Sequence, residues 1–369
     1  MEIGSSSKRG SRRKGKWKPI LTIVLVLIII RLALPFALQS YFNARLDQID
    51  GYAGQVDRVS VSVLRGAYTL HDVTVVHREL DIPSAFFQAD RLHFFVQWSE
   101  VFQGNRVGAV RMQGPELHFA VSSEGESRYG VGVDWSEELS GLFPWRINQV
   151  EVHGGEAHFS DFSRELPVHV WIGNVVAEVR NLANTLELEE EMSASLRARG
   201  RPMGAGRFSM NVAFAPGNET PAFELSMAVS GLVLESLDSL LRTYGNYRIR
   251  SGLFDLFGEV SAYQGNYEGQ VTTFFSDLDA QWWREPEPPL EEEHEDEPGV
   301  VWPLQQRWEA IGEPVVELRG PPESLVLRAP FSTSFEVDDI ALEAAMARVL
   351  VDLFVHGLVP GLELQAEED

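Results

Sequence analysis

The sequence contains no cysteine in 369 residues. This absence excludes disulfide bonds and thiolate metal sites, and it suits a protein of an oxidising compartment. The common catalytic and nucleotide-binding motifs are also missing, since no GxSxG elbow, P-loop, GxGxxG or HExxH occurs. The sequence therefore gives no local indication of an enzyme or of a cofactor.

Basic residues are scarce beyond the N-terminus. Residues 1–18 hold seven Lys or Arg against one acid, whereas residues 39–369 hold 23 basic and 53 acidic residues, a formal charge of −30. Such an acidic body repels phosphate backbones, so we expect no nucleic-acid partner. Apolar residues make up 44% and charged residues 23% of the chain, which is typical of folded proteins.

One long apolar run follows the basic tail. The 19 residues "ILTIVLVLIIIRLALPFAL" (20–38) would form a helix of about 28 Å. Only Arg31 and Pro35 interrupt this apolar run. We therefore expect a basic cytoplasmic tail at 1–18 and an uncleaved transmembrane anchor at 19–39. The alternative is a secretory signal peptide, but residues 35–40 offer no small-residue cleavage site. The charge distribution places the N-terminus in the cytoplasm and the bulk of the chain in the periplasm.

Alternation of apolar and polar residues dominates the remainder. "GYAGQVDRVSVSVLRGAYTLHDVTV" (51–75) predicts two strands joined by a turn at Arg65-Gly66-Ala67, with a bulge at His71-Asp72. Similar alternation recurs along the chain and predicts a mainly β fold, a long curved antiparallel sheet with one apolar face. Counting by parity gives the residues of that face as Val59, Val61, Val63, Phe94, Val96, Trp98, Phe208, Met210, Val212, Phe214, Leu225 and Met227.

Helical signals are few after the anchor. Residues 235–244 and the amphipathic stretch 338–356, which ends near Gly357, are predicted helices. The acidic, proline-rich segment 284–299 has little to bury and predicts a linker or exposed loop. It divides a β domain at 40–283 from a C-terminal β segment at 300–369.

The densest group of polar side chains lies in "HGGEAHFSD" (153–161). His153, Glu156, His158 and Asp161 do not all share one parity, so a metal site would need help from the turn at Gly154-Gly155. We interpret the segment as a hairpin with polar edges and expect neither catalysis nor a metal. A pocket that joined His153, His158 and Asp161 would favour an enzyme instead.

Several segments together resemble a known family. The basic tail and single span, followed by "YFNARLDQIDGYAGQVDRVSVSVLRGAYTLHDVTV", "WRINQVEVHGGEAHFSDF" and "YRIRSGLFDLFGEVSAYQGNYEGQVTTFFSDLDA", resemble AsmA-like proteins of the domain-of-unknown-function 748 branch. The likeness covers most of residues 20–284 and, more weakly, 314–358. It implies a Gram-negative periplasmic protein anchored in the inner membrane, with an apolar groove in a curved sheet. Larger relatives such as TamB and YhdP are associated with phospholipid movement, and the shorter chain favours a local chaperone, an adaptor or one part of an assembly.

Two interpretations of the apolar face remain open. In the first it lines an open groove that binds phospholipid acyl chains. In the second it is a closed core, covered by the helix at 338–356 and a second sheet layer, in a structural protein that recruits envelope partners through its edge strands.

Overall fold

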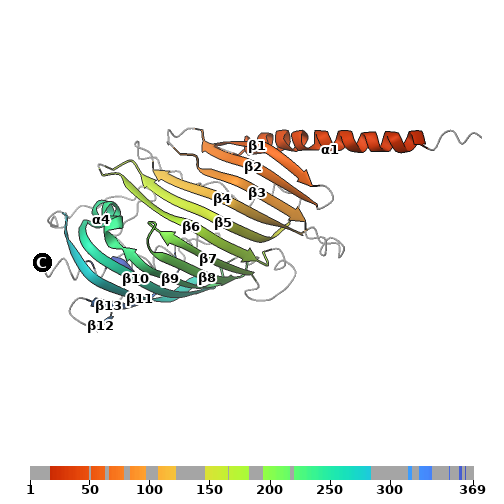
Figure 1. Ribbon diagram of the computed structural model, residues 1–369. Helices are drawn as coiled ribbons and strands as arrows, with labels where there is room; N and C mark the ends of the chain where they lie inside the picture. Colours follow the sequence, from red (N-terminus) through yellow and green to blue (C-terminus); the bar gives the residue numbers. More distant parts are fainter. Residues whose placement is uncertain are drawn as a thin grey trace, which may run out of the picture.

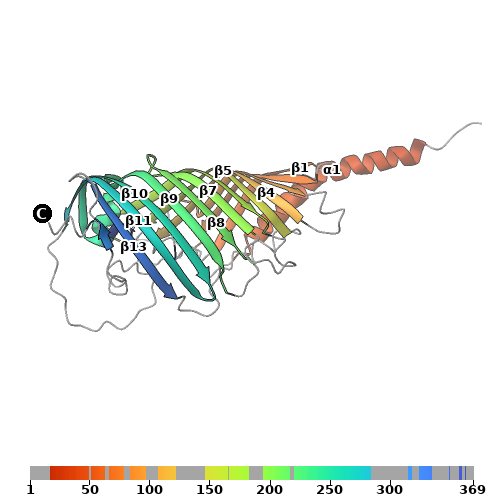
Figure 2. The ribbon, with the colours of Figure 1, turned by 90° about the horizontal axis from the view of Figure 1, so that it is seen from below.

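A single β-sheet organises the chain in the computed structural model (Figures 1 and 2). Its thirteen strands lie in the order β1 to β11, then β13 and β12. The prediction of a mainly β fold with few helices is confirmed. The strands are β1 (Tyr52–Ser62), β2 (Ala67–His77), β3 (Phe87–Val96), β4 (Val107–Val121), β5 (Arg146–Asp161), β6 (Val168–Arg180), β7 (Ala194–Pro202), β8 (Arg207–Phe214), β9 (Phe223–Val233), β10 (Tyr247–Tyr263), β11 (Asn266–Trp282), β12 (Val315–Glu317) and β13 (Ser324–Ser334).

The structure describes most of the chain between residues 17 and 283 and shorter pieces beyond it. The described residues are 17–49, 51–62, 66–78, 84–96, 107–121, 146–164, 166–182, 194–216, 220–283, 315–317, 324–334, 349, 357–359 and 362.

The sheet is mixed, so the prediction of a wholly antiparallel sheet was wrong at one pair. Strands β4 and β5 run parallel, with Val110 opposite Val150, while the other described pairs are antiparallel. A tight turn can join only antiparallel strands, and a parallel pair needs a connection that returns the chain to the same end of the sheet. That connection, residues 122–145, lies outside the described residues.

The first two strands form the hairpin that the sequence predicts. Val59 pairs with Leu70, and Gly66 in the turn has a φ of 60°. The predicted break in alternation is present at Asp72, whose φ is 53°. The register does not shift there, since Asp57 lies opposite Asp72, so both strands are interrupted together and no one-sided bulge forms. Val56 and Val59 on β1 are both buried although two exposed residues separate them. The paired interruption therefore keeps the apolar residues of both strand halves on one face.

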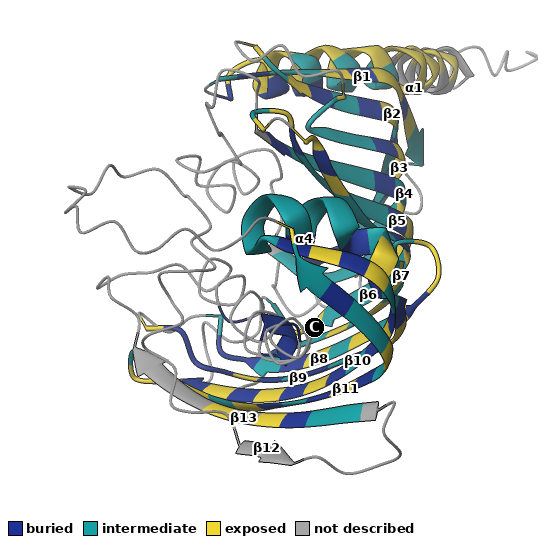
Figure 3. Cartoon of the chain, turned by 90° about the vertical axis from the view of Figure 1, so that its left-hand side faces the viewer, coloured by how far each residue is buried: buried dark blue, intermediate teal, exposed yellow. Residues whose placement is uncertain are grey.

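Similar interruptions recur in neighbouring strands. They fall at or beside Asp57, Asp72, Asp90, Gly114, Gly154 and Asn174, in strands β1 to β6. Asp72, Gly114, Gly154 and Asn174 have positive φ values, a conformation that Gly, Asn and Asp adopt more readily than other residues. From β1 to β5 the interruptions lie opposite one another, so the register does not shift at these positions, whereas it shifts between β5 and β6 and between β6 and β7. Bulges bend strands and increase their twist, and the sheet is curved in Figure 3.

Helix α1 (Trp17–Leu46) covers the β1 edge with its last turns. The helix extends past residue 39, the expected end of the anchor. Asn43 Oδ1 accepts a hydrogen bond from the Val56 amide at 2.7 Å, and the Gln39 side-chain amide donates to the Val56 carbonyl at 3.1 Å. These side chains satisfy backbone groups of the edge strand, which would otherwise be open to pairing with another chain.

The first half of α1 projects beyond the sheet (Figure 1). Its described apolar side chains include six that are exposed: Leu21, Leu25, Ile28, Ile29, Leu32 and Phe36. In the part of the chain that the structure describes, no helix combines the length and the apolarity needed to span a membrane. The transmembrane anchor at 19–39 stays a prediction.

Two short helical elements lie inside the curve of the sheet. They are η3 (Leu234–Leu237) and α4 (Asp238–Gly245), and they confirm the helix predicted at 235–244. Asp238 Oδ1 accepts a hydrogen bond from the Ile249 amide at 3.0 Å, and Asn246 ends α4 in the left-handed conformation. The polar contact and the cap fix the helix against β10.

The C-terminal region joins the same sheet. Strand β13 pairs with β11, so the chain after the predicted linker is not a separate sheet. The linker itself, 284–299, lies outside the described residues. Of the predicted helix at 338–356 only Val349 is described, and it is helical. Gly357–Val359, just beyond the predicted helix, are helical as well.

The packing of α1 on β1 predicts the effect of a small substitution. A Cβ atom at Gly54 would lie 2.5 Å from Leu46 Cβ and 3.1 Å from Leu46 Cδ1. We expect Gly54→Ala to displace the last turn of α1 and to lower the free energy of unfolding by about 1–3 kcal/mol. Urea unfolding followed by tryptophan fluorescence measures the change. Ser261→Ala at an exposed position of β10 is the control, with an effect within about 0.5 kcal/mol; equal effects would contradict this packing.

Candidate functional site

One face of the sheet carries continuous rows of apolar side chains. Residues directly opposite each other on neighbouring strands project to the same face, so the register defines each row. The first apolar row runs from β1 to β10 as Val61, Tyr68, Phe94, Val110, Val150, Val179, Leu196, Val212, Leu225 and Val260. The second apolar row runs from β1 to β11 as Val59, Leu70, Leu92, Met112, Val152, Ala177, Ala198, Met210, Met227, Gly258 and Val271.

The end of these rows on β1–β4 is closed by α1. Phe42 and Leu46 from the helix pack with Val59 and Phe94 from the sheet, and all four side chains are buried. The Phe42 ring also stacks on the ring of Tyr68, with centroids 5.6 Å apart. This part of the apolar face is the core that holds α1.

The other end of the rows is closed by α4, η3 and C-terminal residues. Leu241 of α4 and the C-terminal Leu362 are buried in the same cluster as Leu225 and Phe254. A Cβ atom at Gly357 would lie 2.8 Å from Thr273 Cγ2, so the C-terminal backbone rests directly on the sheet. Over β8–β11 the apolar face is therefore a closed core, as the second interpretation of the sequence expects.

Between the two clusters the apolar rows are only half-buried. Val150, Val152, Ala177 and Ala198 keep intermediate exposure, and none of them belongs to either core cluster of the described residues. We call these four residues the middle section. In the first row only Val150 on β5 lacks this cover, because Val179 and Leu196 pack against the second cluster, whereas in the second row the incompletely covered stretch spans β5–β7.

The described residues predicted for the apolar face lie on it. Six are buried, namely Val59, Phe94, Val212, Phe214, Leu225 and Met227, and three are partly buried against the clusters, namely Val61, Phe208 and Met210. Val63 and Trp98 lie outside the described residues, and the side chain of Val96 is not described. Whether any of these residues contacts lipid stays a prediction.

The middle section was not among the predicted residues. Its signal was present, because Val150 and Val152 alternate with Glu151 and His153. The glycines and histidines that follow led to a hairpin being predicted there. Strand β5 instead runs without a turn from Arg146 to Asp161, so the hairpin prediction was wrong. The glycines form a bulge within one long strand.

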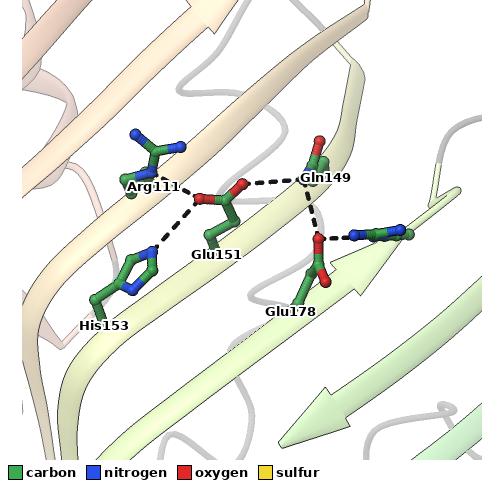
Figure 4. A network of polar contacts seen from close by, with 6 residues as sticks. Arg111, Gln149, Glu151, His153 and Glu178 are labelled. Carbon is green, nitrogen blue, oxygen red and sulfur yellow. Dashed lines mark hydrogen bonds and ion pairs between the residues drawn. The ribbon is translucent and has the colours of Figure 1, made fainter.

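The opposite, outer face of β4–β6 carries a polar network (Figure 4). Arg111 Nε donates to Glu151 Oε2 at 2.6 Å, and His153 Nε2 lies 3.4 Å from the same oxygen. Gln149 Nε2 donates to Glu151 Oε1 at 3.0 Å and to Glu178 Oε1 at 3.2 Å. The hydrogen bond from Arg111 holds the pKa of Glu151 below its ordinary value. A carboxylate engaged in this way serves strand pairing rather than proton transfer.

Three histidines stack further along the outer face. The rings of His118 and His158 lie 4.5 Å apart and nearly parallel, and those of His158 and His169 lie 5.5 Å apart. His158 Nε2 also lies 3.1 Å from Glu156 Oε2. Burial, together with the neighbouring His158, lowers the pKa of both His118 and His169. The stacked rings add to the contact between β4, β5 and β6.

Asp161 has a different role from its neighbours in the sequence. Its carboxylate is 2% exposed and accepts hydrogen bonds from Tyr244 of α4 and from the Ser163 amide at 2.8 Å. Arg164 Nε lies 3.6 Å away. Burial disfavours the charge, but these contacts outweigh it and hold the pKa of Asp161 below its ordinary value. Asp161 therefore fastens α4 to the end of β5.

The four polar residues of 153–161 do not form one site. His153 contacts Glu151, His158 contacts Glu156, and Asp161 contacts α4. Within the described ranges no group of three or more His, Cys, Asp or Glu is placed to hold a metal ion.

Comparison with known proteins adds no identification, since neither a protein-family model nor a curated protein matches the chain.

The Asp161 contact predicts a pH-dependent stability. Because its pKa is lower in the folded state, its contribution is present above about pH 4 and is lost as the pH falls through the folded-state value. We expect Asp161→Asn to lower the free energy of unfolding by about 1–3 kcal/mol at pH 7 and by less at pH 3. Urea unfolding at both pH values measures this. Tyr244→Phe should show a smaller loss, and an unchanged stability of Asp161→Asn at pH 7 would exclude this contact.

Proposed function

We propose that the protein is an inner-membrane-anchored periplasmic protein that binds phospholipid acyl chains along the apolar face of its sheet. In this role it guides lipid within the cell envelope and performs no chemistry. The observation that carries the proposal is the pair of apolar rows, which continue across the middle section although that section is only half-buried.

The middle section has the chemistry that an acyl chain requires. Val150, Val152, Ala177 and Ala198 present only aliphatic groups on the inner face, while charged and polar neighbours project to the outer face. Each methylene group that leaves water for such a surface contributes about 0.8 kcal/mol. A lipid tail lying along several strands would gain enough to remain bound while its headgroup stays in water.

Helix α1 supports the membrane side of the proposal. Its exposed apolar part, from Leu21 to Phe36, continues without a break into the last turns, where Phe42 and Leu46 are buried. A membrane contact of the exposed part would therefore be joined to the sheet by a single helix. The seven basic residues before it favour the cytoplasmic side for the N-terminus. The anchor would bring the edge of the sheet next to the bilayer.

A second candidate is a structural or partner-binding envelope protein with a closed core. The specific observation in its favour is the complete burial at both ends of the apolar rows, where Leu225, Phe254 and Leu362 are inaccessible to any ligand. The two candidates differ only in whether the middle section accepts lipid.

Photocrosslinking in intact cells tests the proposal. A photoreactive amino acid at Val150, Val152 or Ala198 should capture phospholipid. The matched control is the same probe at Glu151 or Arg197, which neighbour the middle section but face outward. Absence of lipid at the three inner positions, in a folded and anchored protein, would favour the closed core.

A stability measurement separates the two candidates independently. We expect Ala177→Phe to change the free energy of unfolding by less than about 1 kcal/mol, because an open section has room for the ring. In a closed core the same ring would cost about 1–3 kcal/mol by overpacking. Ala262→Phe on β10 is the matched control, because Ala262 is fully buried and should be destabilised in either case. Chemical denaturation measures both variants.

A further inference from the structure

An unusual row of positive charge lies on the outer face of the sheet. Arg197, Arg199 and Arg201 on β7 and Arg207 at the start of β8 are all exposed. None of the four has an ion pair or side-chain hydrogen bond with another described residue. Such a row is unexpected in a chain whose residues 39–369 carry a formal charge of −30.

The neighbouring strands do not compensate these charges. Arg199 faces a serine on β8 and a valine on β6, and Arg201 faces a glycine on β6. Arg197 lies opposite Glu178, but that carboxylate already accepts a hydrogen bond from Arg180 at 2.6 Å. Among the described residues, Arg199 and Arg201 thus have no acidic side chain opposite them on β6 or β8.

The spacing of the row indicates the shape of that anion. Alternate residues of a strand lie on one face, about 6.7 Å apart. An extended peptide has the same repeat, and guanidinium groups bind carboxylates through two parallel hydrogen bonds. We propose that Arg197, Arg199 and Arg201 bind an extended acidic segment of a partner protein, whose carboxylates occupy alternate positions.

The outer face has room for such a chain beside the row. A hollow of about 400 Å³ extends over β8 to β11; Ser209 and Asn211 line its side next to β7, and Glu259 on β10 lines its far side. Ser209 and Asn211 lie directly opposite Arg199 and Arg197. Small side chains next to the arginines leave space for a peptide backbone, and their hydroxyl and amide groups can bond to it.

A peptide fits this surface better than an anionic bilayer does. Glu224 on β9, Glu259 on β10 and Glu268 on β11 are exposed on the same outer face. Glu259 is three strands from Arg197, a distance of about 14 Å. A broad anionic surface would meet these glutamates as well as the arginines, whereas a chain one strand wide contacts only the row. The outer face is also convex in Figure 3, which limits contact with a flat membrane.

Fluorescence anisotropy on the full-length protein in detergent tests the proposal. The probe is a labelled eight-residue peptide that alternates Glu and Ser. We expect Arg199→Gln/Arg201→Gln to weaken its binding about tenfold and added salt to weaken binding to the wild type. The matched control is Arg58→Gln/Arg91→Gln, which removes the same charge from exposed arginines of β1 and β3 and should leave binding unchanged.

Two further probes complete the test. A peptide with the four Glu in one block and the four Ser in another should bind more weakly than the alternating peptide. Equal binding of the two peptides, equal losses in the two double variants, or no binding to the wild type would each overturn the proposal. Phosphatidylglycerol vesicles whose binding falls in Arg199→Gln/Arg201→Gln, but not in the control, would overturn it in favour of a lipid surface.

Discussion

The structure depends on the register of the strands, which keeps apolar residues opposite apolar residues across the whole sheet. A shift of one residue at any pair would turn the apolar side chains of the following strands to the other face. The parallel pair is the critical junction, because Val110 must meet Val150 there for the first apolar row to continue. From β1 to β5 the interruptions lie opposite one another and leave this register unchanged, whereas the register shifts between β5 and β6 and between β6 and β7.

The apolar face created by this register needs cover, and the chain supplies it unevenly. One end receives the last turns of α1, held by Asn43 and by the close contact at Gly54. The other end receives α4, fastened through Asp161, and the C-terminal residues around Leu358. Helix α4 also reaches β5, through Asp161, and contacts β6 directly. The middle section nevertheless lies outside both core clusters of the described residues.

Polar and charged contacts join neighbouring strands on the outer face, whereas apolar packing does so on the inner face. On β4–β6 its carboxylates pair with arginines of the same strands, as Glu151 does with Arg111. On β7 the arginines have no such partner among the described residues. The two ligands that we propose, acyl chains on the inner face and an acidic segment on the outer face, would therefore meet different chemistry. Because the sheet separates them, the two binding proposals stand or fall independently.

The sequence by itself determined the strand alternation, the hairpin at β1–β2 with its break in alternation at Asp72, and the face on which residues such as Phe94 and Met227 lie. These features are local, since side-chain parity and turn residues follow from adjacent positions. The parallel pairing of β4 with β5 and the single long strand through Gly154 were decided only by the tertiary structure. Strand pairing depends on contacts between residues far apart in sequence, and a glycine bulge and a glycine turn have the same local signal. For the same reason, only the fold revealed which part of the apolar face the chain leaves half-covered.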